Sequence, residues 1–283
     1  MHDTADEFIR VLVLVPLVDG SSTQTVVTLG TPTKLTHPDG RLEYKMVIDS
    51  DLSVTPMEKE PTGKTRTGTR DGLRWEIPQG YPGASTGLLD HEPLIRDYLM
   101  ARFHGGKVFV DVGANVGAYA LRAALVGMKV HAFEPNPENV KILRRNAEIN
   151  GLSIDIYEAA LGAEARTVNL SSMGATSRVT EEDGIAVPMT LLDRFKLPMV
   201  DLIKVDVEGH ELEVLEGSVK TLERFHPELM IEMHHWIGAE KEAAIFDILS
   251  GLGYRFEYLD RFTQGRHLVA TYAPPTSADP RNR

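Results

Sequence analysis

The sequence contains no cysteine. Disulfide bridges, thiolate metal sites and a thiol nucleophile are therefore excluded, and a reducing cytoplasm is the expected compartment. Basic residues are also in the minority: 30 Lys and Arg residues face 41 Asp and Glu residues, and the formal net charge is -11. Phosphate contacts need clustered basic side chains, so this balance argues against a general nucleic-acid-binding protein without excluding a local basic patch.

Long hydrophobic runs are missing as well. The longest early run, Val11 to Val18, is interrupted by Pro16 and is far too short to cross a bilayer. The first residues are acidic rather than basic, so no secretory signal is expected. Hydrophobic residues still make up 42% of the 283 residues, which is enough for a sizeable core. We expect a soluble protein without a membrane partner, with one large domain or one domain and a small companion.

Composition and turn signals divide the chain into four parts. Residues 1–70 are rich in strand-forming residues and end in a stretch rich in Thr, Gly and charge, which predicts a β-rich domain or extension with a linker. Residues 71–104 are a connector with one helix, predicted from Glu92 to Phe103. Residues 105–275 form the predicted main domain, and residues 276–283 are a polar tail.

Strands and helices alternate from Lys107 onward, which is typical of a parallel α/β sheet. The strands are predicted at 107–112, 129–133, 154–160, 201–207 and 229–233, with a final pair beginning at 255 and 267. The helices are predicted at 116–126, 137–150, 211–224 and 239–252. A less regular stretch after residue 160 contains one more candidate strand at 167–170.

A glycine-rich turn follows the first of these strands. Asp111 stands just before it, and Gly113 and Gly117 lie four positions apart. Glycines at such a place let the backbone approach a ligand closely. Dinucleotide sites favour a third glycine in the middle of this turn, but Ala114, Asn115 and Val116 stand there instead. The turn therefore favours a single adenosine-type ligand without phosphates, and S-adenosylmethionine (SAM) is the usual one.

An acidic residue on the next strand supports nucleoside binding. Glu134 ends that strand, 21 positions after Gly113. A carboxylate there can accept hydrogen bonds from both ribose hydroxyls. The competing interpretation is a solvent-exposed glutamate at a strand end. Asp111 and the two glycines upstream favour the ribose contact.

These motifs resemble the FkbM family of SAM-dependent methyltransferases. The resemblance covers roughly residues 85–272 and is carried by VFVDVGANVG from Val108, HAFEPNPEN from His131, RNAEIN from Arg145, TLLD from Thr190 and DLIKVDVEGHE from Asp201. It implies a Rossmann-like class I methyltransferase fold with a seven-stranded sheet whose last two strands form an antiparallel hairpin. It also implies methylation of an oxygen, often on sugars, polyketides or other natural products. The expected cofactor-binding residues are Asp111, Gly113, Asn115, Gly117, Glu134, Asn136, Ala160 and Asp206.

Candidate catalytic residues follow the two later parallel strands. Methyl transfer to a hydroxyl needs its proton removed, by a general base or by a metal that lowers its pKa. In open α/β sheets ligands lie at the carboxyl ends of the strands. Period-two alternation places Lys204, Asp206 and Glu208 on one face there. The competing interpretation is a structural Lys204–Asp206 ion pair or caps for the following helix.

The next strand delivers Glu232, His234 and His235 to the same edge. His234 is a candidate base, and Asp206, His234 and His235 are candidate ligands for Mg or Mn. His210 could be a base or a helix-start residue.

Three functions follow in order of preference. The first is a SAM-dependent O-methyltransferase acting on a hydroxyl of a sugar, glycan or other small natural product. The second is an RNA ribose 2'-O-methyltransferase, with the N-terminal β region binding RNA and a basic surface around Lys64 to Arg74. The third is a non-catalytic SAM-binding interaction module.

Overall fold

The computed structural model describes residues 65–78, 93–171, 177–262 and 265–273, together with four N-terminal strands. The chain separates into two compact units, Met1–Glu60 and Pro61–Arg283. The first unit holds two antiparallel pairs of strands. The linker expected at the end of residues 1–70 is wrong in its last part, because residues 65–70 form a strand that pairs with the next one, and its earlier part lies outside the described residues. These pairs are β1 (Ile9–Pro16) with β2 (Ser22–Leu29), and β3 (Thr33–Thr36) with β4 (Leu42–Lys45).

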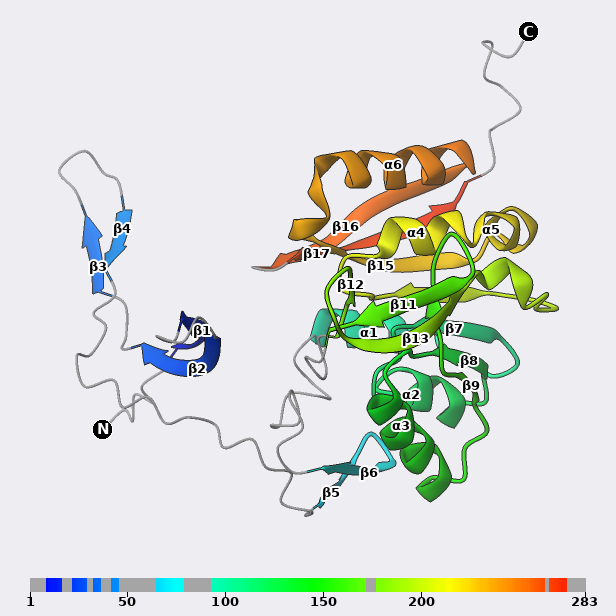
Figure 1. Ribbon diagram of the computed structural model, residues 1–283, viewed down its shortest axis with the longest axis horizontal. Helices are drawn as coiled ribbons and strands as arrows, with labels where there is room; N and C mark the ends of the chain where they lie inside the picture. The colour runs from blue at the N-terminus through cyan, green and yellow to red at the C-terminus, as the bar shows by residue number, and fades with distance from the viewer. Residues whose placement is uncertain are drawn as a thin grey trace, which may run out of the picture. The chain divides into compact units, whose positions relative to one another are not determined.

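A seven-stranded sheet forms the centre of the second unit (Figure 1). Four of its neighbouring pairs are parallel, and only one strand, second from one edge, runs antiparallel to its neighbours. The fold class and the terminal antiparallel hairpin expected from the sequence are thereby confirmed. In sheet order the strands are β16 (Tyr254–Phe262), β17 (Gly265–Tyr272), β15 (Glu228–His234), β14 (Leu202–Val205), β7 (Val108–Val112), β8 (Lys129–Phe133) and β9 (Asp155–Tyr157).

The central strands are buried on both faces because their apolar side chains alternate between two cores. On β7, Phe109 packs into one core, whereas Val110 and Val112 pack into the other. Each such side chain contributes about 1.5–3 kcal/mol by leaving water. Three helices cover each face (Figure 1): α1 (Pro93–Met100), α2 (Ala120–Leu125) and α3 (Pro137–Ile149) on one, and α4 (Glu211–Glu216), α5 (Val219–Phe225) and α6 (Gly238–Gly251) on the other.

Two helices differ from the sequence prediction. The helix expected from Val116 begins only at Ala120, because Gly117 has φ +96° and the chain is still turning there. The helix expected at 211–224 is divided into α4 and α5 at Gly217, whose backbone lies against the carbonyl of Gly162. A Cβ at Gly217 would stand 2.0 Å from that carbonyl oxygen, so a side chain cannot be accommodated here.

A second, four-stranded sheet lies between β9 and β14 in the chain. Its order is β10-β13-β11-β12, and only β11 was expected from the sequence. Ala160, which we expected at the end of the third strand of the main sheet, belongs instead to this second sheet. Its strands are β10 (Ala160–Leu161), β11 (Arg166–Leu170), β12 (Val179–Thr180) and β13 (Ile185–Thr190).

A hairpin precedes the main sheet and packs on its α1–α3 face. It consists of β5 (Thr65–Arg70) and β6 (Leu73–Pro78), joined by Asp71 and Gly72. Both turn residues have positive φ, as a two-residue hairpin turn of type I′ requires. Asp71 pairs with the buried Arg122 at 2.7 Å. Trp75 is only 3% exposed and belongs to the core on this face.

Among the described residues, no helix is both long and apolar enough to cross a membrane.

Candidate active site

The glycine turn after β7 is held against the loop that follows β14. Gly113 has φ +79°, and a Cβ on it would lie 1.8 Å from the main-chain oxygen of Asp206. A Cβ on Gly117 would collide with Leu121 and Leu143, at 2.1 and 2.4 Å. Both glycines are therefore required by close contacts within the protein itself, Gly113 with the loop after β14 and Gly117 with side chains of α2 and α3.

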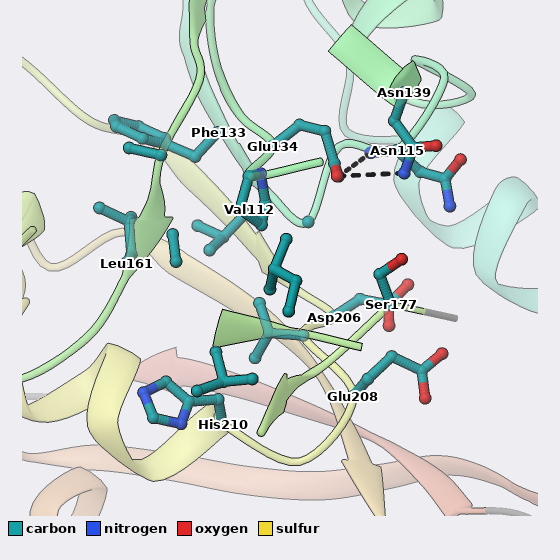
Figure 2. Close-up of a pocket in the computed structure, with 17 residues that line it drawn as sticks. Val112, Asn115, Phe133, Glu134, Asn139, Leu161, Ser177, Asp206, Glu208 and His210 are labelled. Carbon is teal, nitrogen blue, oxygen red and sulfur yellow. Dashed lines mark hydrogen bonds between the residues drawn. The ribbon is translucent and has the colours of Figure 1, made fainter. Parts of the chain in front are cut away.

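Glu134 lies directly after β8, and its carboxylate accepts three hydrogen bonds. Figure 2 shows those from Asn115 and Asn139. The Oε2 of Glu134 accepts a hydrogen bond from the main-chain N–H of Asn115 at 2.8 Å. Its Oε1 accepts from the main-chain N–H of Asn136 at 2.9 Å and from Nδ2 of Asn139 at 3.1 Å. A carboxylate offers about four acceptor positions, so about one is left for a ligand rather than the two we expected for ribose. Burial raises the pKa of Glu134 to about 7.

A pocket lies between the carboxyl ends of β7, β8 and β14 and the second sheet (Figure 2). About 620 Å³ of space lies within it when its open mouth is included. Its walls are largely apolar, and its carboxylates are Glu134, Asp206 and Glu208. The apolar lining comes from Val112, Phe133, Pro135, Ala159, Ala160, Leu161, Leu170, Val179 and Val207.

Five of the eight residues expected to bind the cofactor line this pocket: Gly113, Asn115, Glu134, Ala160 and Asp206. The other three, Asp111, Gly117 and Asn136, do not line it.

Asn136 uses its Oδ1 to cap α3 through Glu138 and its Nδ2 to bind Ser177. Asp111 is buried under the turn, and burial, offset in part by the charge of Lys204, raises its pKa to about 6.

Two polar side chains of the pocket, Asn139 and Ser177, were not among the residues expected at the site. Asn139 lies three positions after Asn136 at the start of α3, a spacing that places both on one helix face and could have drawn attention to it. Ser177 comes from an irregular stretch before β12, and nothing in the local sequence distinguishes it.

Lys204 and Asp206 form the ion pair that we considered as the competing interpretation. Nζ of Lys204 lies 2.8 Å from Oδ2 of Asp206 and 5.2 Å from the centre of the Tyr119 ring. Lys204 is buried, whereas Asp206 reaches the pocket. Burial alone would raise the pKa of Asp206, but the charge and hydrogen bond of Lys204 outweigh it and hold the pKa below its ordinary value. Asp206 is therefore an anion at neutral pH.

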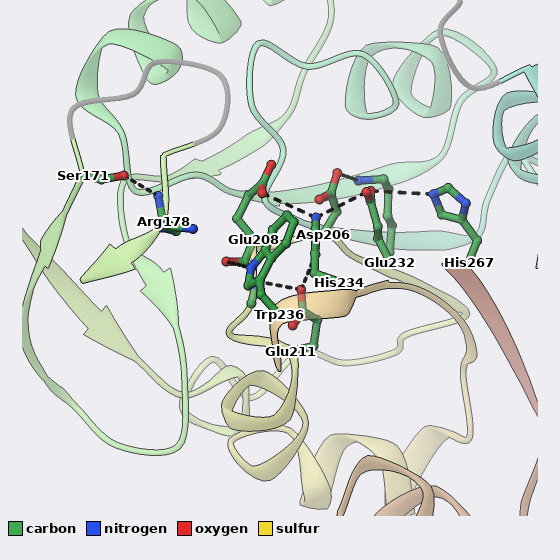
Figure 3. A network of polar contacts seen from close by, with 11 residues as sticks. Ser171, Arg178, Asp206, Glu208, Glu211, Glu232, His234, Trp236 and His267 are labelled. Atoms are coloured by element: carbon green, nitrogen blue, oxygen red, sulfur yellow. Dashed lines mark hydrogen bonds and ion pairs between the residues drawn. The ribbon is translucent and has the colours of Figure 1, made fainter. Parts of the chain in front are cut away.

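Glu208 and His234 meet at the rim of the pocket (Figure 3). Nε2 of His234 lies 3.4 Å from Oε2 of Glu208 and 3.4 Å from Oε1 of Glu232. Its Nδ1 lies 2.8 Å from Oε1 of Glu211, which is fully buried. Burial opposes a charged ring, but the hydrogen bond to Glu211 and the surrounding carboxylates prevail and raise the pKa of His234 to about 9.

The pKa of Glu208 moves in the opposite sense to that of Asp206. Burial, reinforced by the charge of Asp206, raises it above its ordinary value. Glu208 also has φ +57°, an unusual conformation for a residue with a side chain, which costs of order 1–3 kcal/mol. The fold thus holds a strained, basic carboxylate at the pocket wall.

The structure brings together part of the candidate metal set. One ligand atom each from Asp206, Glu232 and His234 lies within 4.8 Å of the others. His235 is exposed and stands outside this group, because β15 ends at His234 and a short 3-10 helix begins at the next residue. His210 lines the pocket as the residue before α4, and burial lowers its pKa.

The sheet order, the acidic residue after the second strand and the polar ends of the fourth and fifth strands define a class I SAM-dependent methyltransferase. The model of the Methyltransferase FkbM domain matches residues 111–256. The chain belongs to the FkbM methyltransferase family.

Three similar proteins illustrate this relationship. Hexuronic acid methyltransferase AglP of Haloferax volcanii is 28% identical over 204 residues, which cover 69% of this chain and 81% of AglP. A crystal structure of methyltransferase FkbM from Methylobacillus flagellatus is 20% identical, with a TM-score of 0.45, over 58% of this chain and 43% of that one. The 16S rRNA N2 G1207 methyltransferase of T. thermophilus, solved with AdoMet and guanosine, is 13% identical, with a TM-score of 0.47, over 74% of this chain and 50% of that one. This chain therefore spans half or less of each of the two solved chains.

Proposed function

We propose that this protein transfers a methyl group from SAM to a hydroxyl oxygen of a sugar or a sugar-like small molecule. The observation that carries the proposal is the position of Glu208. Its carboxylate lines the cofactor pocket, has a raised pKa and is backed by His234. A hydroxyl acceptor needs a base at this place, and a carboxylate whose pKa is raised toward neutrality is a better base than an ordinary one.

The pocket fits SAM in both shape and charge. Its apolar walls suit an adenine ring, and the remaining acceptor position of Glu134 suits one ribose hydroxyl. SAM supplies a methyl group on a positively charged sulfur. Asp206 and Glu208 place negative charge in the same pocket and favour such a cation.

Within this scheme each polar residue has one task. Glu208 would take the hydroxyl proton while the methyl carbon exchanges its bond to the SAM sulfur for a bond to the acceptor oxygen, and the rest of SAM would leave as a neutral thioether. His234, held as a cation by Glu211, keeps Glu208 oriented toward the pocket through the 3.4 Å contact. Lys204 holds Asp206 in the ionised state. Catalysis then consists of positioning and removal of one proton.

The choice of a sugar rests on two observations. The name of the AglP relative specifies a hexuronic acid as its substrate. The pocket is lined by three carboxylates and by neither Lys nor Arg among the described residues, which disfavours the phosphate backbone of RNA. RNA ribose methylation stays the alternative. Of its predicted basic surface, Lys64 lies outside the described residues, and the exposed Arg74 stands on β6, which does not line the pocket.

A metal-assisted form of the same reaction is the second candidate. It is favoured by the grouping of Asp206, Glu232 and His234, since carboxylates suit Mg and Mn. We prefer the metal-free form because Lys204 already pairs with Asp206, and the Glu211 contact keeps a proton on His234.

The test is transfer of tritium from methyl-labelled SAM into separate pools of sugars, small natural products and RNA, each with Mg and with a chelator. We expect label in the sugar pool as an O-methyl group. Label in RNA alone would favour the alternative, and label that depends on Mg would favour the second candidate.

A further inference from the structure

Trp236 lies at the pocket rim and has no part in the chemistry described so far. It follows His234 on the short 3-10 helix η3 (His235–Ile237) and is 46% exposed. The other tryptophan of the chain, Trp75, is only 3% exposed. A half-exposed indole next to a proposed base needs an explanation, because large aromatic side chains are normally buried on folding.

Three contacts fix the indole in place (Figure 3). Its Nε1 donates a hydrogen bond to the main-chain oxygen of Glu208 at 3.3 Å. Its ring packs on that of His234, with centroids 4.5 Å apart and an angle of 36°. Gly209 leaves room for it, since a Cβ there would stand 2.8 Å from Nε1. The exposed part of the indole is therefore a rigid apolar surface next to Glu208.

A cation stands near the same carboxylate on the side of the second sheet. Arg178 is exposed and makes no ion pair within the described residues, and Figure 3 shows it beside Ser171 on the second-sheet side of Glu208. Its neighbours Ser177 and Val179 both line the pocket. Its main chain is anchored, because its N–H donates to Oγ of Ser171 at 3.1 Å and Ser177 binds Asn136 at 3.0 Å.

We infer that Trp236 and Arg178 form the acceptor subsite and that it takes an acidic sugar. This inference rests on the proposed function, because it names the acceptor of that same site. The C–H face of a pyranose ring is apolar and stacks on an indole, while the ring hydroxyls point sideways, toward Glu208. A carboxylate on the sugar would pair with the guanidinium of Arg178, which offers a planar pair of N–H donors. Because three carboxylates line the pocket, an anionic acceptor needs a cation nearby, and Arg178 would supply it.

The experiment uses fluorine NMR on the full chain labelled with 5-fluorotryptophan. Two resonances are expected, and Trp236→Phe identifies the one from Trp236. Methyl β-D-glucuronide and methyl β-D-glucoside are the probes, because they differ only in the carboxylate. We expect the glucuronide to shift the Trp236 resonance in a saturable manner and the glucoside to bind about tenfold more weakly. Trp75 serves as the internal control and should not respond.

Two variants separate the contribution of Arg178 from that of Trp236. Arg178→Gln should remove the preference for the glucuronide and leave the binding of the glucoside unchanged. Trp236→Ala should weaken both sugars about tenfold, measured by calorimetry, without changing the affinity for SAM.

A Trp236 resonance that neither sugar shifts, in protein that binds SAM, would overturn the inference, and so would equal binding of both sugars. Neither readout needs turnover. Sugar binding without methyl transfer would therefore contradict the proposed function alone.

Discussion

Nε2 of His234 lies 3.4 Å from Oε2 of Glu208, while its Nδ1 contacts the fully buried Glu211 at 2.8 Å. The two ends of one imidazole thus join a carboxylate at the pocket wall to a carboxylate in the core. Because β15 carries His234 and the loop after β14 carries Glu208, the contact also connects two neighbouring strand ends. The carboxylate that we propose as the base is thus held at the pocket wall by a contact within the protein.

Replacing Glu208 by glutamine tests the proposed base. Glutamine keeps the size of the side chain but cannot take a proton, so kcat should fall about 10²–10⁴-fold. The affinity for SAM, measured by calorimetry, should change little. Glu164→Gln is the matched control on the exposed surface, where the carboxylate pairs with Arg166, and it should retain full activity. A Glu208→Gln variant with wild-type kcat would remove Glu208 from the mechanism.

The pH dependence of SAM binding should report on Glu134. Burial raises its pKa to about 7, so the free protein protonates it as the pH falls below 7. A protonated carboxyl accepts fewer hydrogen bonds, and SAM should therefore bind about tenfold more weakly at pH 6 than at pH 8. The sign is opposite for folding: the raised pKa stabilises the free protein at low pH, and this contribution is lost as the pH rises from about 4.5 to 7.

Calorimetry at the two pH values measures this dependence, and Glu134→Gln is the control. The glutamine variant should bind SAM weakly, and its affinity for SAM should no longer differ between pH 6 and pH 8. If the affinity for SAM changes equally between the two pH values in the wild type and the variant, a group other than Glu134 causes the pH dependence.

Gly113→Ala tests the contact between the glycine turn and Asp206. The added Cβ would stand 1.8 Å from the carbonyl oxygen of Asp206, so the two loops must separate. We expect a loss of stability of order 3 kcal/mol or more, and weaker SAM binding.

Gly151→Ala is the matched control for this prediction. Gly151 also has positive φ, but nothing lies within 4 Å of its Cβ position. It should lose only about 1 kcal/mol, from backbone strain alone. Denaturant unfolding of both variants gives the difference, and equal losses would show that the close approach costs nothing.

Removal of metal separates the two forms of the reaction. With Lys204 on Asp206 and a proton on His234, the carboxylates already have cationic partners. We therefore expect initial rates after treatment with a chelator to stay within about twofold of the untreated rate, which corresponds to about 0.4 kcal/mol. A loss of activity that Mn restores would contradict this and favour a cation held by Asp206, Glu232 and His234.

The main sheet could be predicted from the sequence because its central strands are apolar runs with helices between them. The second sheet could not, since Ala160–Leu161 and Val179–Thr180 are too short to show a period. Alternation along β15 places Glu232 and His234 on one face and so could have replaced His235 by Glu232 in the metal set. To apply this alternation, the position at which β15 ends had to be known, and sequence patterns locate strand ends poorly.

The roles of individual polar atoms depend on partners far away in the chain. Glu134 was predicted at the cofactor site and lines the pocket, but most of its acceptor positions are filled by Asn115, Asn136 and Asn139. In the same way, Gly113 could be predicted as a turn residue, whereas its contact with Asp206, which lies on a distant strand end, could not. Local patterns indicate which residues gather at the strand ends, and only packing determines which of their atoms remain available.

The central claim is most directly tested by one transfer measurement. Wild-type protein and Glu208→Gln are each incubated with SAM labelled with ¹³C in the methyl group and with methyl β-D-glucuronide, and the products are followed by NMR. The account predicts an O-methyl signal on the sugar with the wild type and a signal at least a hundredfold slower to appear with the variant. An O-methyl signal that grows equally fast with both proteins would contradict it.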